Sequence, residues 1–322
     1  MLRKLRELIG DNTLFLFNTR NQDPNFVYLA DIPAGFESNA LFVNRNSFLH
    51  LTNTMEYERA KKTSLARPKI VSSVFEFLKK NHTGKILLNG RFLPFKARDK
   101  IRKFAKTEDF SEQLEKLRLI KTKEELSRIR KAKQIALAAF KKERFSGTET
   151  EIRRRIESCF EPAYPTIVAA DNNSSLPHYF PANSVAKKLL LIDFGAKYKN
   201  RICDLTRMKL ISPTSKMKQL NQLALDAQAA AKDAAAPGVK ASEITNAAYK
   251  IIEKAGYKKN ILHALGHGIG VDVHESPVIS TKSDTVLEPG MAFTIEPGIY
   301  TKTFGVRVED DYTITKTGCK LI

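Results

Sequence analysis

The sequence predicts an α+β protein in which a smaller mixed α/β domain precedes a larger domain of helices and hairpins. The chain has 322 residues, which is enough for two domains or for one large domain with a substantial core. Over roughly the first 110 residues, strand-like and helix-like segments alternate. Beyond a long amphipathic segment, Ala-rich helices are interspersed with strand pairs that fit hairpins. We therefore expect two domains, at residues 1–115 and 116–322.

The N-terminal part shows strand signals first. Runs of aromatic and aliphatic residues bounded by Asn, Pro and Gly predict strands at 13–18, 25–31, 40–45 and 47–53. Helices are expected at 55–65, 70–80 and 95–105, with a buried strand at 85–90 before the last of them. This part contains no glycine-rich phosphate loop. Its two histidines, His50 and His82, are interpreted as core or surface residues.

The C-terminal part begins with the amphipathic helix, which is expected at about 122–142. An Ala-rich helix at 215–236 should end at Pro237 and Gly238, because Pro cannot continue a helix and Gly favours helix ends. Ser242 and Glu243 begin another helix, which runs to Gly256. Hairpin-like strand pairs lie between and after these helices.

The composition excludes several classes of protein. With 42% hydrophobic and 28% charged residues, the chain is neither disordered nor a disulfide-rich miniprotein. No apolar run approaches the roughly 20 residues of a membrane span, and the first residues lack the apolar core of a signal peptide. Cys159, Cys203 and Cys319 are scattered and are interpreted as reduced thiols. We therefore expect a cytoplasmic protein without a membrane partner.

The net charge of +19 raises the question of nucleic-acid binding. Residues 1–150 carry 31 basic and 17 acidic side chains, and 151–322 carry 23 and 18. The densest region, 116–144, mixes both signs along a helix, which is typical of a solvated face with ion pairs. Nucleic acid is therefore not expected as the primary partner, although a weak, salt-sensitive affinity for polyanions stays open.

Two acidic residues lie on neighbouring strand-like segments between residues 189 and 210. Asp193 follows an apolar run, and Asp204 lies on the next segment, beyond a short turn. A hairpin centred on Tyr198 and Lys199 would pair the two acids directly, with Cβ atoms about 4.5–5.5 Å apart. Carboxylates this close on an apolar face repel each other unless a cation lies between them. The pattern therefore indicates a cation site.

A second acid pair lies near the C-terminus. Glu296 and Glu309 flank a turn near residues 302–303 and are expected to pair across another hairpin. Because alternate residues of a strand share a face, Arg307 should point with Glu309, and Thr294 with Glu296. A cation and a hydroxyl aimed at buried carboxylates are typical of the groups that support metal ligands.

Three histidines lie between these acid pairs, in the segment HALGHGIGVDVHESP: His263, His267 and His274. The glycines around His267 let the backbone approach closely. Each of these residues alone would more often be a turn, loop or core residue. Together, four carboxylates and an imidazole suit two divalent ions such as Mn²⁺, Co²⁺ or Zn²⁺ and not a thiolate zinc site. Two ions about 3.5–4 Å apart form the clamp that aminopeptidases use.

Five stretches within residues 164–311 resemble the pita-bread metallopeptidases, the family of methionine aminopeptidase, aminopeptidase P and Xaa-Pro dipeptidase (prolidase). They are YPTIVAADNNSSLPHY, LLLIDFGAKYKNRICDLTR, HALGHGIGVDVHESP, LEPGMAFTIEPGIY and GVRVEDD. The first part resembles the creatinase-type N-terminal domain, notably in NFVYLAD and LRLIKTKEELSRIRKA. The resemblance implies a creatinase-like domain at 1–115 and, at 116–322, a pita-bread catalytic domain with a curved antiparallel sheet.

The resemblance also implies the metal ligands. Two divalent ions would be bound, Mn²⁺ or Co²⁺ in the first place and Zn²⁺ as a further option, with no organic cofactor. Asp204 and Glu309 would bridge the two ions. The full set of implied ligands is Asp193, Asp204, His267, Glu296 and Glu309.

Catalytic roles follow from the same resemblance. Glu296 would act as the base for a hydroxide that bridges the ions and attacks the scissile carbonyl. His178, His263 and His274 would line the substrate pocket, hold the peptide and help protonate the leaving proline nitrogen. Arg307 would brace a metal-binding carboxylate.

The stretches LPHY, VHESP and GVRVEDD resemble the proline-specific branch of the family. They imply an exopeptidase that hydrolyses the Xaa-Pro bond at the N-terminus of dipeptides or short peptides. Several dipeptidase-type relatives carry a basic residue just after the Pro of the HExP motif, where this chain has Val278. Dipeptides and longer peptides therefore both stay open as substrates.

Two other functions compete with a peptidase. A catalytically inactive pita-bread module could bind nucleic acid or a protein partner, which the charge of +19 would suit. A creatinase-like enzyme would hydrolyse a C–N bond without metal. The five filled ligand positions favour the metallopeptidase over both. Because relatives are often dimers, a homodimer is expected.

Overall fold

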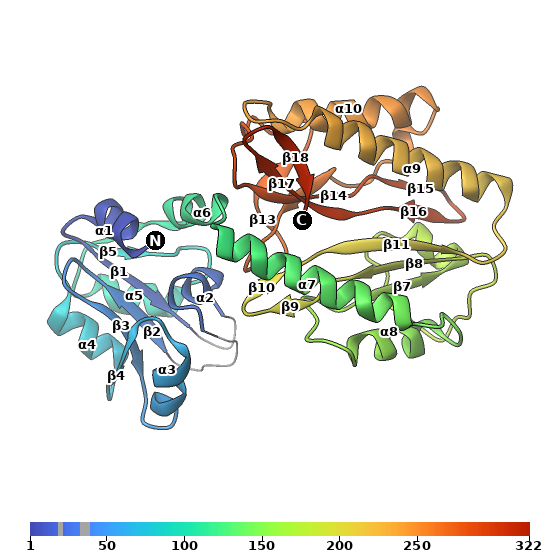
Figure 1. Ribbon diagram of the computed structural model, residues 1–322. Coiled ribbons are helices and arrows are strands. Elements are labelled where there is room, and N and C mark those ends of the chain that lie inside the picture. Colours follow the sequence, from blue (N-terminus) through green and yellow to red (C-terminus); the bar gives the residue numbers. More distant parts are fainter. Residues whose placement is uncertain (19–21, 33–38) are drawn as a thin grey trace. The chain divides into compact units, whose positions relative to one another are not determined.

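The computed structural model describes residues 1–18, 22–32 and 39–322. The chain divides into two compact units, Met1–Arg118 and Leu119–Ile322. Each unit has its own sheets, helices and hydrophobic core (Figure 1). No helix within the described ranges combines the length and the apolar composition that crossing a bilayer requires.

The first unit is built on a six-stranded mixed sheet with the order β4-β3-β2-β1-β5-β6. Its strands are β1 (Thr13–Phe17), β2 (Ala40–Val43), β3 (Phe48–Thr52), β4 (Arg67–Ile70), β5 (Ile86–Leu88) and β6 (Thr107–Asp109). The pairs β1–β2 and β2–β3 are antiparallel, whereas β4, β5 and β6 each run parallel to their neighbours. The helices are α1 (Leu2–Ile9), α2 (Pro24–Ala30), α3 (Tyr57–Thr63), α4 (Val74–Asn81), α5 (Phe95–Arg102) and α6 (Ser111–Leu119).

Two sequence predictions in this unit were wrong. Residues 25–31 were expected to be a strand, but residues 25–30 lie in helix α2, which begins with Pro24, is capped by the Asp23 side chain and ends before the C-cap residue Asp31. All seven residues of α2 are buried, so it has no polar face by which periodicity could separate it from a strand. The helix expected at 70–80 begins only at Val74, because residues 67–70 form the edge strand β4.

The second unit contains two antiparallel sheets and two short ribbons. One sheet has the order β11-β8-β7, with β7 (Ile167–Ala170), β8 (Leu189–Phe194) and β11 (Leu205–Leu210). The other has the order β13-β12-β14-β17-β18, with β12 (Gly266–Gly268), β13 (Glu275–Ile279), β14 (Ala292–Ile295), β17 (Asp310–Thr315) and β18 (Gly318–Leu321). The ribbons pair β9 (Lys197–Tyr198) with β10 (Arg201–Ile202), and β15 (Gly298–Tyr300) with β16 (Gly305–Arg307). A backbone bridge between Thr206 and Glu309 links the two sheets.

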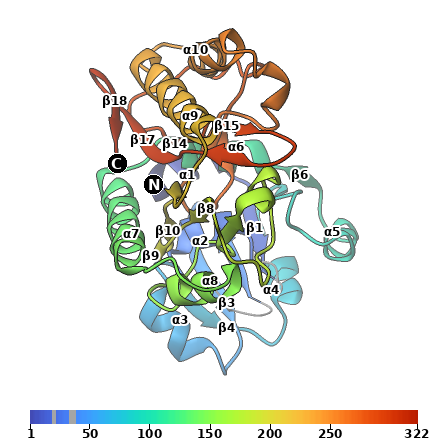
Figure 2. The same cartoon turned by 90° about the vertical axis from the view of Figure 1, so that its right-hand side faces the viewer.

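Four helices cover this unit: α7 (Lys123–Lys142), α8 (Glu149–Glu157), α9 (Ser215–Ala234) and α10 (Ala241–Lys254), with short 3₁₀ turns at Asp171–Ser175 and Lys258–Asn260. Helices α7 and α8 share a buried cluster with the β7–β8–β11 sheet. Helices α9 and α10 pack on the other sheet, as Figures 1 and 2 show. Each sheet therefore has one face covered by helices and one face free to carry a site.

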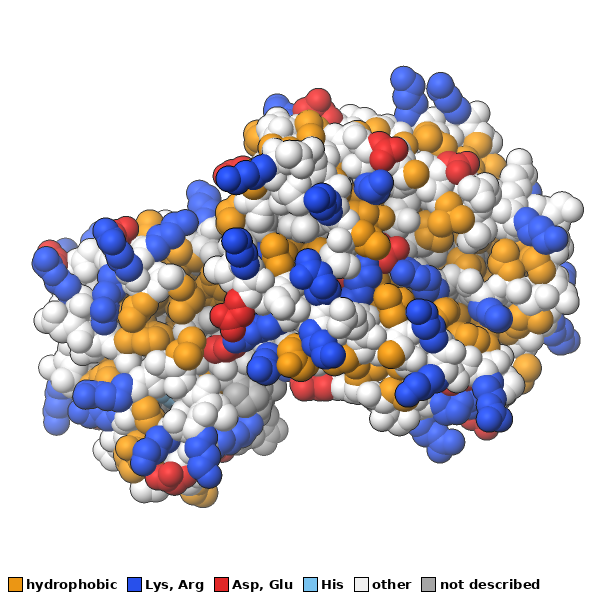
Figure 3. All heavy atoms as spheres, viewed as in Figure 1, with side chains coloured by type: hydrophobic (Ala, Val, Ile, Leu, Met, Phe, Trp, Pro, Cys, Tyr) orange, Lys and Arg blue, Asp and Glu red, His pale blue; other side chains and the backbone are white. Residues whose placement is uncertain are grey.

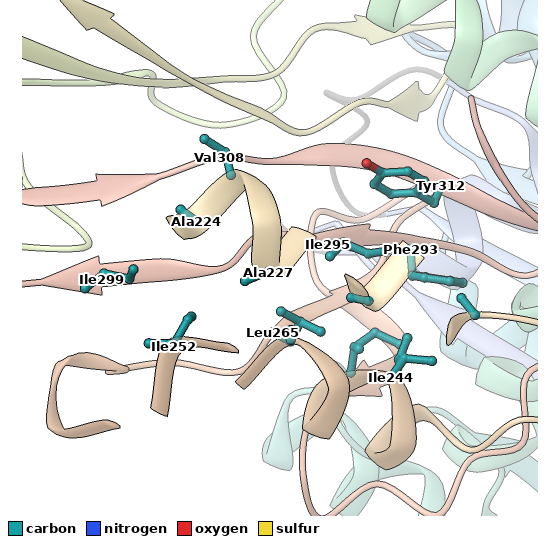
Figure 4. Close-up of a cluster of buried hydrophobic side chains, with 14 of the residues drawn as sticks. Ala224, Ala227, Ile244, Ile252, Leu265, Phe293, Ile295, Ile299, Val308 and Tyr312 are labelled. Carbon is teal, nitrogen blue, oxygen red and sulfur yellow. The ribbon is translucent and has the colours of Figure 1, made fainter. Parts of the chain in front are cut away.

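The cluster under α9 and α10 is the larger of these two cores. This cluster, which Figure 4 shows, includes Ala224 and Ala227 of α9, Ile244 of α10, and Phe293 and Ile295 of β14. The small side chains of α9 allow close packing of the helix on the sheet, and each large apolar side chain buried here contributes about 1.5–3 kcal/mol. This packing holds β14 and the β15–β16 ribbon rigidly.

Figure 3 shows Lys and Arg side chains spread over the face in view, with Asp and Glu side chains among them. Several of these charges are paired along a helix, such as Lys116 with Glu112 and Arg128 with Glu124. The distribution fits the solvated, mixed-sign helix faces expected for residues 116–144.

The buried His50 predicts a pH-dependent stability for the first unit. Its ring packs against Phe26, and burial lowers its pKa to about 4. Between pH 6.5 and 4 the unfolded chain binds a proton here that the folded chain does not. The free energy of unfolding should therefore fall as the pH falls through this window, by up to about 3 kcal/mol.

The variant His50→Gln isolates this effect. Denaturant unfolding of both proteins at pH 7 and at pH 4.5, followed by circular dichroism, should give a smaller loss of stability for the variant. Equal losses in the two proteins would contradict the assignment.

Candidate metal centre

The side chains of the site project from the faces of the two sheets that the helices leave free. In β8, Ile192 and Phe194 pack against α7 and α8, so Asp193 points to the opposite face. In β16 and just beyond it, Val306 and Val308 pack beneath α9. The Arg307 side chain between them therefore points to the opposite face, where the site lies. The alternation of each strand thus separates residues that build the core from residues that build the site.

The first hairpin has a different register from the one predicted. Asp193 pairs with Thr206 and not with Asp204, because the turn lies at Lys199–Asn200, one residue later than expected. Both turn residues have positive φ, 45° and 58°, as in a two-residue turn that matches the twist of a hairpin. Asn tolerates this conformation better than Tyr, which explains the shift.

Asp204 nevertheless lies beside Asp193. The Tyr164 Oη atom is 2.5 Å from Asp193 Oδ1 and also donates to Asp204 Oδ1. The backbone N–H of Asp204 donates to both carboxylate oxygens of Asp311, at 3.2 and 3.3 Å. The two acids therefore converge diagonally and not as direct cross-strand partners.

The second hairpin has the predicted turn. Thr301 N–H donates to the Phe304 carbonyl across residues 302–303, and Gly298 pairs with Arg307. Extending this register by two residues places Glu296 opposite Glu309. Glu309 also forms the bridge to Thr206, so this second acid pair meets the first hairpin.

His267 completes the cluster. One ligand atom each from Asp204, His267 and Glu309 lies within 4.8 Å of the others. The His267 Nε2 atom is 3.3 Å from Glu296 Oε1 and 3.6 Å from Asp204 Oδ2. The His267 backbone N–H donates to Thr294 Oγ1 at 3.1 Å, so Thr294, which was expected to support a carboxylate, positions the histidine.

Arg307 braces the acids as predicted. Its Nη2 atom donates to Asp193 Oδ2 at 2.6 Å, and its Nε donates to Thr206 Oγ1 at 3.1 Å. The Thr206 hydroxyl in turn donates to Glu309 Oε2 at 2.7 Å. One buried guanidinium thus supports one acid from each hairpin, directly or through a hydroxyl.

The electrostatics indicate a cation site. Burial raises the pKa of Asp204 and of Glu309 well above the ordinary range, and repulsion from neighbouring carboxylates adds to this. Burial would lower the pKa of His267, yet its hydrogen bond with Glu296 and the charges of Glu296 and Asp204 raise it to about 9. Four converging carboxylates thus face Arg307 and His267 as their nearby cations. The cluster thus has more negative than positive groups. Divalent ions, which accept carboxylate oxygens and imidazole nitrogens as ligands, would balance the excess negative charge, so the residues fit such ions.

The three predicted pocket histidines lie at the edge of this cluster. His263 Nε2 is 2.9 Å from the Tyr300 hydroxyl, and the His274 ring lies across the His267 ring with centroids 4.3 Å apart. Burial lowers the pKa of both His263 and His274. Arg307 Nη1 donates to the carbonyl of Pro177 at 3.3 Å, which places the next residue, the exposed His178, near the same space.

Several residues of the site were not predicted: Tyr164, Thr206, Tyr300 and Asp311. Tyr300 lies four residues after Glu296, so strand alternation could have revealed it. Tyr164 lies in an irregular segment before β7, where no periodic signal indicates the direction of a side chain.

Paired antiparallel sheets covered by helices, with converging carboxylates and an imidazole between them, define a metallohydrolase of the pita-bread fold. The model of metallopeptidase family M24 matches residues 127–316. The Xaa-Pro dipeptidase of Pyrococcus furiosus is 37% identical over 83% of this chain and 81% of its own length. That of Pyrococcus horikoshii is 34% identical over 93% and 90%.

Solved structures agree with this result. The chain is similar to an X-Pro aminopeptidase from Thermotoga maritima, with a TM-score of 0.90, 28% identity and coverage of 99% and 97% of the two chains. It is also similar to the prolidase from Pyrococcus furiosus, with a TM-score of 0.88, 31% identity and coverage of 100% and 98%. The chain belongs to metallopeptidase family M24, and it is an enzyme that uses divalent metal ions.

Replacement of one acid should separate metal binding from folding. A saturating divalent ion, at about 100 times its dissociation constant, should stabilise the wild type by about 2.7 kcal/mol. Asp204→Asn should lose most of this gain. Without metal, the variant should be at least as stable as the wild type, because it removes a buried charge that its neighbours repel.

The measurement is the melting temperature with and without Mn²⁺ after chelator treatment. Asp226→Asn, an exposed position on α9, serves as the control and should keep the full shift. A full metal-dependent shift in Asp204→Asn would contradict the site.

Proposed function

We propose that this enzyme hydrolyses the Xaa-Pro bond at the N-terminus of dipeptides or short peptides. The observation that carries the proposal is the convergence of four carboxylates with His267 beside three further histidines. Relatives named Xaa-Pro dipeptidase and a solved X-Pro aminopeptidase support the substrate class. All five expected ligand positions carry a residue that can bind a metal ion, which favours an enzyme over an inactive binding module.

Two divalent ions would be held by Asp193, Asp204, His267, Glu296 and Glu309, with Mn²⁺ or Co²⁺ as the proposed metals. Such ions supply Lewis acidity for the scissile carbonyl and make water a stronger acid. The protein supplies the proton acceptor. Burial would raise the pKa of Glu296, yet the hydrogen bond and charge of His267 lower it, so Glu296 is ionised and can accept a proton.

The pocket histidines would handle the peptide. Because the pKa values of His263 and His274 are lowered, both rings are neutral at pH 7 and can donate or accept a hydrogen bond. The Arg307 Nη1 donates to Tyr300 Oη, whose proton is then directed to His263 Nε2. This chain of hydrogen bonds would orient His263 toward the peptide, and His178 would contact it at the exposed edge.

Other expectations belong to the same proposal. A homodimer follows from the resemblance to the family, and light scattering would test it. A cytoplasmic location is supported by the three free cysteines. The division into a creatinase-like domain at 1–115 and a catalytic domain at 116–322 is supported by the position of the whole site in the second compact unit.

Activity assays test the proposal directly. The chelated protein should regain hydrolysis of Ala-Pro or Ala-Pro-Ala on addition of Mn²⁺ or Co²⁺, and Ala-Ala-Ala should be a poor substrate. Glu296→Gln should lower kcat by at least about 100-fold, because it removes the proton acceptor. Glu253→Gln, exposed on α10, is the matched control and should retain activity. A folded, metal-loaded wild type that cleaves no Xaa-Pro peptide would exclude the function.

Position 278 bears on the length of the substrate. Val278 pairs with His267 across β12 and β13, shares its face and is 54% exposed. An apolar side chain there offers no charge to the free carboxylate of a dipeptide. We expect a higher kcat/KM for Ala-Pro-Ala than for Ala-Pro.

Val278→Arg should raise kcat/KM for Ala-Pro by about tenfold or more, as a new charge-assisted hydrogen bond would. Hydrolysis of Ala-Pro-Ala is the internal control and should change little. An unchanged ratio of the two substrates in Val278→Arg would show that this position does not select for length.

A further inference from the structure

The hydroxyl of Tyr164 occupies an unusual position between two acids. Its Oη atom is 2.5 Å from Asp193 Oδ1 and also contacts Asp204 Oδ1. A phenol hydroxyl has a single O–H proton, and here this proton serves two neighbouring carboxylates.

Backbone hydrogen bonds fix the ring at this place. Residues 161–163 lie along the hairpin that carries both acids, with Ala163 N–H donating to the Gly195 carbonyl and Lys197 N–H to the Glu161 carbonyl, each at 2.8 Å. Tyr164 follows directly. The phenol and the two acids thus belong to one hydrogen-bonded framework and cannot shift independently.

Gly195 leaves the room that the ring needs. A Cβ atom at this position would lie 2.8 Å from the Tyr164 ring and 2.2 Å from the Cys203 carbonyl oxygen. Any other residue would therefore push apart the tyrosine and the paired strand. The glycine two residues after Asp193 serves the same arrangement as the phenol.

We propose that Tyr164 is a positioning residue for the metal centre, which sets the separation of the Asp193 and Asp204 carboxylates. The inference rests on the proposed function of these acids as metal ligands. With Tyr164 on Oδ1 and Arg307 on Oδ2, both oxygens of Asp193 are held. Asp204 Oδ2 meanwhile faces His267 at 3.6 Å. Without the phenol, the two acids would lose the hydroxyl that joins their Oδ1 atoms, and their repulsion would be opposed from the far sides, by Arg307 at Asp193 and by His267 at Asp204.

The variant Tyr164→Phe tests the hydroxyl alone, because the ring and its packing remain. We expect the affinity for Mn²⁺ to fall by 10- to 100-fold, as is typical when a group that orients metal ligands is lost. With saturating Mn²⁺, kcat for Ala-Pro-Ala should fall more than KM changes. Tyr28→Phe is the matched control. It removes another buried tyrosine hydroxyl, which donates to the Leu117 carbonyl, and this variant should bind Mn²⁺ like the wild type.

Calorimetric titration of the chelated proteins with Mn²⁺ gives the affinities. Absorption spectroscopy gives a second readout, because the chain has nine tyrosines and no tryptophan. Mn²⁺ should produce a tyrosine difference spectrum in the wild type and in Tyr28→Phe, and a smaller one in Tyr164→Phe.

The inference would be overturned if Tyr164→Phe bound Mn²⁺ as tightly as the wild type does. It would also be overturned if Mn²⁺ did not change the tyrosine absorption of the wild type. If only the variant behaves unexpectedly, the proposed function stands and the role of Tyr164 falls. If the wild type itself neither binds Mn²⁺ nor cleaves Xaa-Pro peptides, both fall. If Tyr164→Phe does not fold, the wild-type spectrum alone decides.

Discussion

Repulsion between buried carboxylates is the constraint on which the structure of the second unit depends. Asp193, Asp204 and Glu309 are all less than a tenth exposed and lie together around His267. The carboxylates of such a cluster move apart or take up protons unless the surrounding residues hold them in place. Burial and this repulsion are the reasons why the pKa values of Asp204 and Glu309 are raised. The helices on the outer faces, the guanidinium of Arg307 and the phenol of Tyr164 are the means by which the chain keeps it closed.

The division of labour between strand faces explains how one sequence encodes both a core and a site. Residues 190, 192 and 194 of β8 pack against α7 and α8, while Asp193 between them faces the cluster. The same holds beneath α9 for Val306 and Val308 around Arg307. Successive side chains of a strand point to opposite faces of the sheet. The buried apolar residues just before and just after a charged residue therefore hold its side chain rigidly on the opposite face.

The fold class and the acid and histidine positions of the cluster could be predicted from the sequence, because strands, helix ends and acid pairs leave local signals. The register of the first hairpin could not, since a choice between Tyr198–Lys199 and Lys199–Asn200 as the turn depends on a small preference of Asn for positive φ. Helix α2 was mistaken for a strand because it is buried on every side. Tyr164 gave no signal, because an irregular segment has no period from which a direction follows.

The bridge between Thr206 and Glu309 joins residues that are 103 positions apart. During synthesis, the hairpin with both aspartates leaves the ribosome first, and its later partners arrive only with β16 and β17. Contacts of such long range form late in folding. A nascent chain that ends before Glu309 therefore holds only part of the acid cluster, so the catalytic centre of a peptidase is assembled only after synthesis has passed residue 309.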